Sequence, residues 1–403
     1  MSLNVLTSTV PRHEEAREVY PDDSDFQNDN SKSSTERENH RGSGRRLLAL
    51  DAARGLAVIG MFLQHFALNE RNAFVAGNTT LLFVLCGGIS YSIMAQRMKE
   101  RGEAKTIFRS KMLARAVFVD VIGYLLIMLN TPYGIILPAY AAMFVLGLVL
   151  INRSTRVLVY TTVALWIFAP PLMILGMSYF SGNYLLQDMA GGPISALALA
   201  PAFVAGMTIA RFNLTNKRIA MTLVCAGFIM LIIGKLLAIY VLPDLTTSFE
   251  DWLVRVQPSS PTPIDEYAIW PNNVTPPLIW HMLLQTAPHT ASSFQMMIGV
   301  GIAFLVIGLA FLIPRKISVI LTPFASVGRV ALTMYAAQFI IVWVLTLLGI
   351  DYGLGEVPLG DLIIIIITLL IGSLIALMPN GPLESMMRCF DRIFSSFGSA
   401  STK

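Results

Sequence analysis

Two side chains that could do chemistry, Arg54 and His65, lie in one apolar stretch near the amino-terminal end of the sequence. They are eleven residues apart, so a helix turning about 100° per residue brings them to the same face, about 16 Å apart along the axis. A neutral imidazole can act as a general base near neutral pH, and a guanidinium suits phosphate or carboxylate. The spacing predicts a base and an anion-binding group on one helix face.

Ionisable residues within a membrane-spanning helix are costly and usually face a cavity or a partner. Asp51 precedes Arg54 by three residues, and we expect it to pair with the guanidinium. Gly55 and Gly60 would let another helix or a ligand approach closely. A second interpretation makes Asp51 and Arg54 an ordinary ion pair at the cytoplasmic end of the span, with His65 an interfacial residue near the outer surface.

The elements that must position these residues are predicted to be membrane helices. Hydrophobic residues make up 55% of the chain and charged residues only 13%, against roughly 25% charged in soluble proteins. About 20 helical residues cross about 30 Å of hydrocarbon. Ten apolar stretches approach that length: 47–68, 74–96, 112–130, 133–151, 157–178, 195–210, 219–242, 292–313, 325–349 and 360–378. We therefore expect an all-α fold, a polytopic membrane helical bundle of about ten transmembrane helices.

The basic residues predict the orientation, because they gather in alternate connections, at 97–111, 153–156, 211–218 and 315–316. Cytoplasmic connections carry the excess of Lys and Arg, so we expect a multi-pass protein of the cell (plasma or inner) membrane with both termini cytoplasmic. The expected organisation is a disordered cytoplasmic tail, a membrane domain with a long outer loop, and a second cytoplasmic tail, at 1–46, 47–380 with 243–291, and 381–403.

The same patterns exclude several classes of function. The net charge of +4 is spread over short connections rather than one stripe, so no nucleic-acid partner is expected. Three cysteines without ligand-like spacing predict no metal site. The sequence also lacks a phosphate-binding or dinucleotide-binding glycine pattern.

Further candidates lie at the predicted outer level. Asn78 opens the second stretch, where a capping role is expected, although it shares the level of His65. His289 precedes the eighth stretch, beneath the long outer loop, and would either handle a proton or order the loop. That loop has no predicted element, and it is either a cover over a cavity or a solvated connection. Within the third stretch, Asp120 is expected to pair with Arg115 or Tyr124.

Several short motifs occur in order along the chain. They are Leu50-Asp51 to Arg54-Gly55 with His65, Phe83 to Gly87, Phe108-Arg109 to Arg115, Pro288-His289, Gly328 to Tyr335, and Gly381 to Glu384 with Arg388. Together they resemble the transmembrane acyltransferase superfamily, which includes the acyltransferase-3 and heparan-α-glucosaminide N-acetyltransferase-like families, and in particular its bacterial branch labelled a domain of unknown function. The resemblance covers roughly residues 45–392.

The resemblance implies transfer of an acyl group, typically acetyl, from cytoplasmic acyl-CoA as co-substrate, without a metal. The acceptor would be a hydroxyl or amine of a cell-envelope glycan or glycolipid, often on the far side of the membrane, and membrane lipid is a further expected partner. His65 takes the role of base and Arg54 that of a structural or phosphate-contacting partner. The cations implied for the coenzyme A phosphates are Arg109, Lys111 and Arg115.

Two positions depart from the superfamily pattern. Cys86 stands where a serine is usual, and Gln338 stands where relatives often carry a second histidine. A function of another class also fits the sequence, namely a transporter or flippase of an envelope lipid or glycan precursor. Ten spans and polar residues at depth suit a carrier too, although the sequence has no internal repeat.

Overall fold

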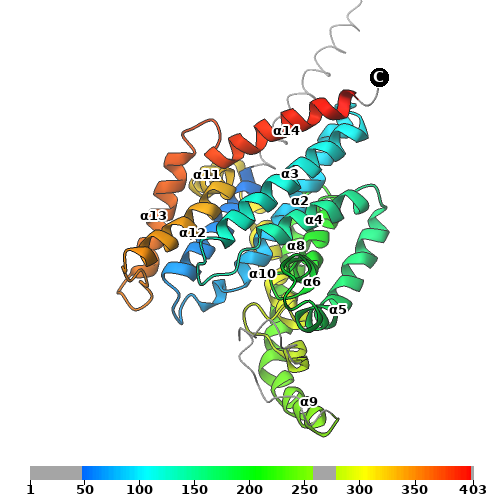
Figure 1. The fold of residues 1–403 in the computed structure, drawn as a ribbon, viewed down its shortest axis with the longest axis vertical. Coiled ribbons are helices and arrows are strands. Elements are labelled where there is room, and N and C mark those ends of the chain that lie inside the picture. The colour runs from blue at the N-terminus through cyan, green and yellow to red at the C-terminus, as the bar shows by residue number, and fades with distance from the viewer. Residues whose placement is uncertain (1–47, 257–277, 401–403) are drawn as a thin grey trace, which may run out of the picture. The chain divides into compact units, whose positions relative to one another are not determined.

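The computed structural model describes residues 48–256 and 278–400, and every regular element within them is a helix (Figure 1). All of these residues belong to one compact unit, Arg45–Lys403. The expected tail 1–46 and the part of the expected outer loop from 257 to 277 lie outside the described residues. The predicted all-α fold is confirmed for the described part.

Each of the ten apolar stretches contains a helix. The first helix covers residues 48–66, and the others are α2 (Asn78–Glu100), α3 (Lys105–Ile127), α4 (Leu137–Leu150), α5 (Thr155–Tyr179), α7 (Ala196–Ile209), α8 (Lys217–Tyr240), α10 (Ser293–Leu312), α12 (Ala331–Leu347) and α13 (Gly360–Ile375).

Four of the described helices are long and apolar enough to cross a membrane: α2 with the short turn η1 (Ala73–Val75) before it, α5, α8 and α10. A fifth crossing results if the bent pair Lys316–Arg329 and Ala331–Leu347 counts as one. These helices indicate a membrane protein, but ten crossings are not confirmed. One reason is length, since the 14 residues of α4 or α7 rise only about 21 Å.

Several helices were not predicted from the sequence. They are α6 (Tyr184–Ala190), α9 (Leu242–Val256) and α14 (Pro382–Ala400), with the 3₁₀ turns η2 (Trp280–Leu284) and η3 (Arg315–Leu321). The prediction of an outer segment without regular structure is therefore wrong for its beginning, where α9 packs against α8 and η2. Polar residues alternate with apolar ones along α9 and α14, which hides them from a search for continuous apolar runs. The stretch 325–349 was predicted as one helix, but it is broken at Val330 into α11 (Thr322–Arg329) and α12.

The first helix is held by close backbone contact with α11. A Cβ at Gly328 would collide with the carbonyl oxygen of Asp51, and a Cβ at Gly55 would collide with that of Phe324. Small residues permit such approach between membrane helices. α11 and α12 meet at an angle of 64° around Val330. This contact fixes the level of Arg54 and, eleven residues on, of His65.

α2 lies at the centre of the fold. Most of its residues are buried, and it packs against both α7 and α10. At the other end of the chain α14 lies along α3 and also touches α12 (Figure 1). These helices surround two cavities near opposite ends of α2.

Candidate functional site

The first cavity, here called the His65 cavity, has a volume of about 590 Å³. Its walls come from the end of the first helix, the α3–α4 connection, the α6–α7 connection and α12. The polar side chains among its lining residues are Gln64, His65, Thr80, Tyr133, Gln187, Asp188, Ser195, His289, Tyr335 and Gln338. The structure therefore brings His65 and His289, which are 224 residues apart in the sequence, to one cavity.

The imidazole of His65 is held between aromatic rings. It stacks on Tyr133 with ring centroids 3.9 Å apart and meets Phe339 edge-on at 5.5 Å. The Tyr133 hydroxyl donates a hydrogen bond of 2.8 Å to the carbonyl oxygen of His65. The buried Nδ1 of His65 has no hydrogen-bond partner among the described residues. An imidazole held in this way with an unused nitrogen has the chemistry of a general acid or base.

His289 enters the same cavity from a constrained loop. His289 and Ala291 have positive φ angles of 62° and 51°, which are unusual for residues other than glycine and recur at functional sites. Nε2 of His289 lies 2.9 Å from Nε2 of Gln64. Burial lowers the pKa of His289, so its imidazole stays neutral at neutral pH. A neutral ring can accept a hydrogen bond from the amide of Gln64.

Arg54 does not line the His65 cavity, and the protein itself takes up its hydrogen bonds. Nη1 contacts Oδ1 of Asp51 at 3.0 Å and the carbonyl oxygen of Gly328 at 3.3 Å. Nη2 donates to Oγ of Ser90 at 2.5 Å. The ion pair with Asp51 is present as predicted from the sequence. Arg54 thus joins the first helix to α2 and α11, and the structure separates it from His65.

One sequence expectation near the cavity was wrong. Asn78 does not cap α2, because Gly77 occupies the capping position and the amide of Asn78 donates to the carbonyl oxygen of Phe74 at 2.8 Å. Thr80, two residues further along α2, lines the cavity, whereas Asn78 does not.

The expected partners of Asp120 are both engaged elsewhere. Arg115 pairs with Asp391, and the Tyr124 hydroxyl donates to Oδ2 of Asp188 at 2.7 Å. Burial raises the pKa of Asp188, which lies in the short helix α6. Asp188 was missed at the sequence level. The only sequence feature that could have indicated Asp188 is its position as an acidic residue in the connection between two apolar stretches.

The second cavity, here called the Arg109 cavity, has a volume of about 730 Å³ and lies where α2 ends and α3 begins. Four cationic side chains contribute to its lining: Lys99, Lys105, Arg109 and Arg211. Glu103 adds one carboxylate. A cluster with this excess of cations favours an anionic ligand such as a phosphate.

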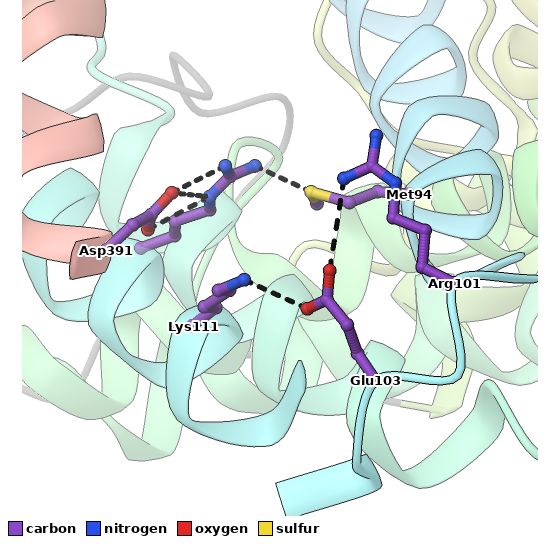
Figure 2. A network of polar contacts seen from close by, with 6 residues as sticks. Met94, Arg101, Glu103, Lys111 and Asp391 are labelled. Carbon is purple, nitrogen blue, oxygen red and sulfur yellow. Dashed lines mark hydrogen bonds and ion pairs between the residues drawn. The ribbon is translucent and has the colours of Figure 1, made fainter. Parts of the chain in front are cut away.

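Only one of the three predicted phosphate-binding cations, Arg109, lines this cavity. Lys111 contacts Oε2 of Glu103 at 3.1 Å, while Arg101 approaches the other oxygen of that carboxylate at 3.9 Å (Figure 2). Arg115 is held by Asp391 at 2.6 Å and by the sulfur of Met94 at 2.8 Å. Lys111 and Arg115 therefore serve ion pairs. Lys99 and Lys105 were not assigned to the phosphates although they lie within ten residues of Arg109, whereas Arg211 reaches the cavity only through the fold.

The two cavities are related through α2. Thr80 lines the His65 cavity and Ser92 lines the Arg109 cavity, which separates them by about 18 Å along the helix axis. A continuous series of ring contacts, here called the aromatic chain, leads from His65 through Phe339, Tyr335, Phe83, Tyr140, Phe144 and Tyr91 to Phe108. Successive centroids are 5.0 to 6.3 Å apart. The rings occupy the space between the cavities.

Residues 268–393 match a family model described as a protein of unknown function (DUF418). Over this part, the chain is similar to an uncharacterised family. The match covers about a third of the chain and does not bear on the acyltransferase resemblance. A comparison with curated proteins finds no match.

The part that matches DUF418 includes both His289 and Gln338. His65, Asp188 and the cations of the Arg109 cavity lie outside it. The matched segment therefore supplies one wall of the His65 cavity, from α12 and the loop before α10, while the rest comes from the first half of the chain.

Proposed function

We propose that this protein is an integral membrane acyltransferase. It moves an acyl group, acetyl in the simplest case, from cytoplasmic acyl-CoA to a hydroxyl or amine of a cell-envelope glycan or glycolipid. The proposal includes about ten crossings with both termini in the cytoplasm. The observation that carries it is the half-buried His65, which lines a cavity large enough for the head group of an acceptor and whose Nδ1 has no hydrogen-bond partner among the described residues.

The proposed reaction begins with transfer of the acceptor proton to Nδ1 of His65. The acceptor oxygen or nitrogen then forms a bond to the thioester carbonyl carbon, and the carbon–sulfur bond breaks. The thiolate of coenzyme A leaves and takes the proton from the imidazolium, so that His65 returns to its neutral form. Stacking on Tyr133 holds the ring in place through these steps.

The Arg109 cavity supports the proposed donor site. Its excess of cations suits the phosphates of coenzyme A, and under the expected orientation it opens on the cytoplasmic side. The thioester then has to reach His65 along α2, where the aromatic chain lies. We expect several of these rings to change rotamer when the donor binds.

Purified protein incubated with labelled acetyl-CoA and envelope lipids tests the proposal. Transfer of label to lipid or glycan is expected in the unaltered protein and should be lost in His65→Ala at an equal level of folded protein. His281→Ala is the matched control, because His281 is a buried histidine that does not line the cavity. Undiminished transfer by His65→Ala would contradict its role as base.

A second candidate function is transport or flipping of an envelope lipid or glycan precursor. It is favoured by two cavities near opposite ends of α2 and by the helix broken between α11 and α12, a feature common in carriers. Passage of a labelled glycolipid across proteoliposomes without a covalent product, and no rise in melting temperature with coenzyme A, would favour this alternative.

A further inference from the structure

Gln338 in α12 is a wholly buried amide without a partner. Its relative exposure is 0%, and neither Oε1 nor Nε2 has a hydrogen-bond partner among the described residues. Buried polar groups in proteins are nearly always hydrogen-bonded, because an unpaired group has lost its hydrogen bonds to water and has formed none in the protein. Because Gln338 lines the His65 cavity, the missing partner is expected in that cavity.

The helix around Gln338 is held in place. One turn earlier, the Tyr335 hydroxyl accepts a hydrogen bond of 3.0 Å from the backbone N–H of Ile136. The next residue, Phe339, packs its ring against His65. α12 therefore holds Gln338 in a fixed position on the wall of the cavity that His65 also lines. Of the buried side-chain atoms without partners in the described residues, those of His65 and Gln338 line this one cavity.

The lining of the cavity argues against a charged ligand. All its lining residues are described, and they include neither lysine nor arginine. Its one carboxyl group, on Asp188, already accepts a hydrogen bond from Tyr124. A phosphate here would be buried without a counter-ion, which is strongly unfavourable. Amides, hydroxyls and ring faces instead suit a neutral group rich in hydroxyls.

We infer that Gln338 determines acceptor specificity: its Nε2 donates to, and its Oε1 accepts from, hydroxyls of an uncharged polyhydroxyl head group. One bound hydroxyl would neighbour the hydroxyl that His65 deprotonates. This inference rests on the proposed function for the reacting hydroxyl, whereas binding of the head group needs no transfer.

Binding of octyl glycosides to the protein in nanodiscs tests the inference. The probes are octyl β-glucoside, octyl β-galactoside and octyl α-mannoside, each below its micelle concentration. Octyl glucoside 6-phosphate tests whether a charged head group binds. Octyl tetraethylene glycol ether tests how much binding comes from the octyl chain without a sugar. We expect at least one glycoside to bind tenfold tighter than both comparison compounds, and Gln338→Leu to weaken its binding at least tenfold.

Stability separates this role from a structural one. Gln338→Leu replaces a partnerless amide by an apolar side chain of similar size, so its melting temperature without ligand should equal or exceed that of the unaltered protein. Thr368→Val is the control, because Thr368 is wholly buried on α13 and lines neither cavity. It should leave glycoside binding unchanged.

Three results would overturn the inference: no glycoside binding above that of the ether, preference for the phosphorylated glycoside, or unchanged glycoside binding in Gln338→Leu. Failure of the proposed function looks different. Unaltered protein that binds a glycoside but transfers no acetyl group to it contradicts the acyltransferase and leaves the binding role of Gln338 intact. Transfer with an unchanged acceptor KM in Gln338→Leu contradicts the role of Gln338 alone.

Discussion

Asp391 of α14 holds the guanidinium of Arg115 in α3 through N···O contacts of 2.6, 2.9 and 3.1 Å. Asp391 is buried, so its loss leaves a cation in α3 without compensation. We expect Asp391→Asn to lower the free energy of unfolding by about 3 kcal/mol. Thermal melting of the purified protein measures the loss.

The neighbouring pair of Lys111 and Glu103 provides the control for that prediction. Both side chains are about a quarter exposed, at 28% and 25%. An ion pair of this kind contributes about 0 to 1 kcal/mol, so Lys111→Met should melt close to the unaltered protein. Equal losses of unfolding free energy in Asp391→Asn and Lys111→Met would show that the buried ion pair does not stabilise the packing of α14 on α3.

Glu384 of α14 caps the amino terminus of α12. Its Oε1 accepts hydrogen bonds from the backbone N–H groups of Leu332 and Thr333 at 2.8 and 3.1 Å, and its Oε2 accepts one from the Thr333 hydroxyl at 2.5 Å. Glu384→Ala should cost about 1 to 2 kcal/mol of stability. Hydrogen exchange at these two amides should accelerate, whereas Glu356→Ala, at an exposed glutamate, should leave it unchanged.

Gly328→Ala tests the close contact between the first helix and α11. The added Cβ would collide with the carbonyl oxygen of Asp51, so the backbones have to separate. We expect a loss of about 1 to 3 kcal/mol. Gly353→Ala is the control, because a Cβ at that exposed glycine meets one atom at 3.4 Å, an ordinary contact. A melting temperature for Gly328→Ala equal to that of the control would contradict the contact.

The lowered pKa of His289 predicts a dependence of stability on pH. Its folded value lies below the ordinary 6.5, so the unfolded chain binds the proton more readily. The stabilising contribution is therefore fully present above about pH 6.5 and is lost as the pH falls through the folded value. His289→Gln removes this group, so its melting temperature should fall less between about pH 7.5 and about pH 5. An equal fall in both proteins would contradict the prediction.

Much of the fold could be predicted because apolar runs mark helices that lie in lipid. Each of the ten stretches contains a helix, but crossing the bilayer also depends on length. The helices α9 and α14 were missed because they are amphipathic, and their apolar faces become visible only as a helical repeat. The break at Val330 has no proline to signal it.

The candidate site was predictable only in part. His65 and His289 stand out because histidines at the ends of apolar stretches are rare, and both line one cavity. The partners of charged groups were not predictable, since Arg115 meets Asp391 across 276 residues. From the sequence, Gln338 was distinguished only by its departure from the superfamily pattern, where a second histidine is common. Its lack of a partner is a property of packing alone.

The aromatic chain also has an electrical consequence. Seven contacts join the eight rings of this chain, from His65 to Phe108, and these side chains fill the interior beside α2 between the two cavities. Protons and small ions cross hydrocarbon poorly because they lose their hydration there. In a membrane, this packing would oppose the passage of protons and small ions from one cavity to the other.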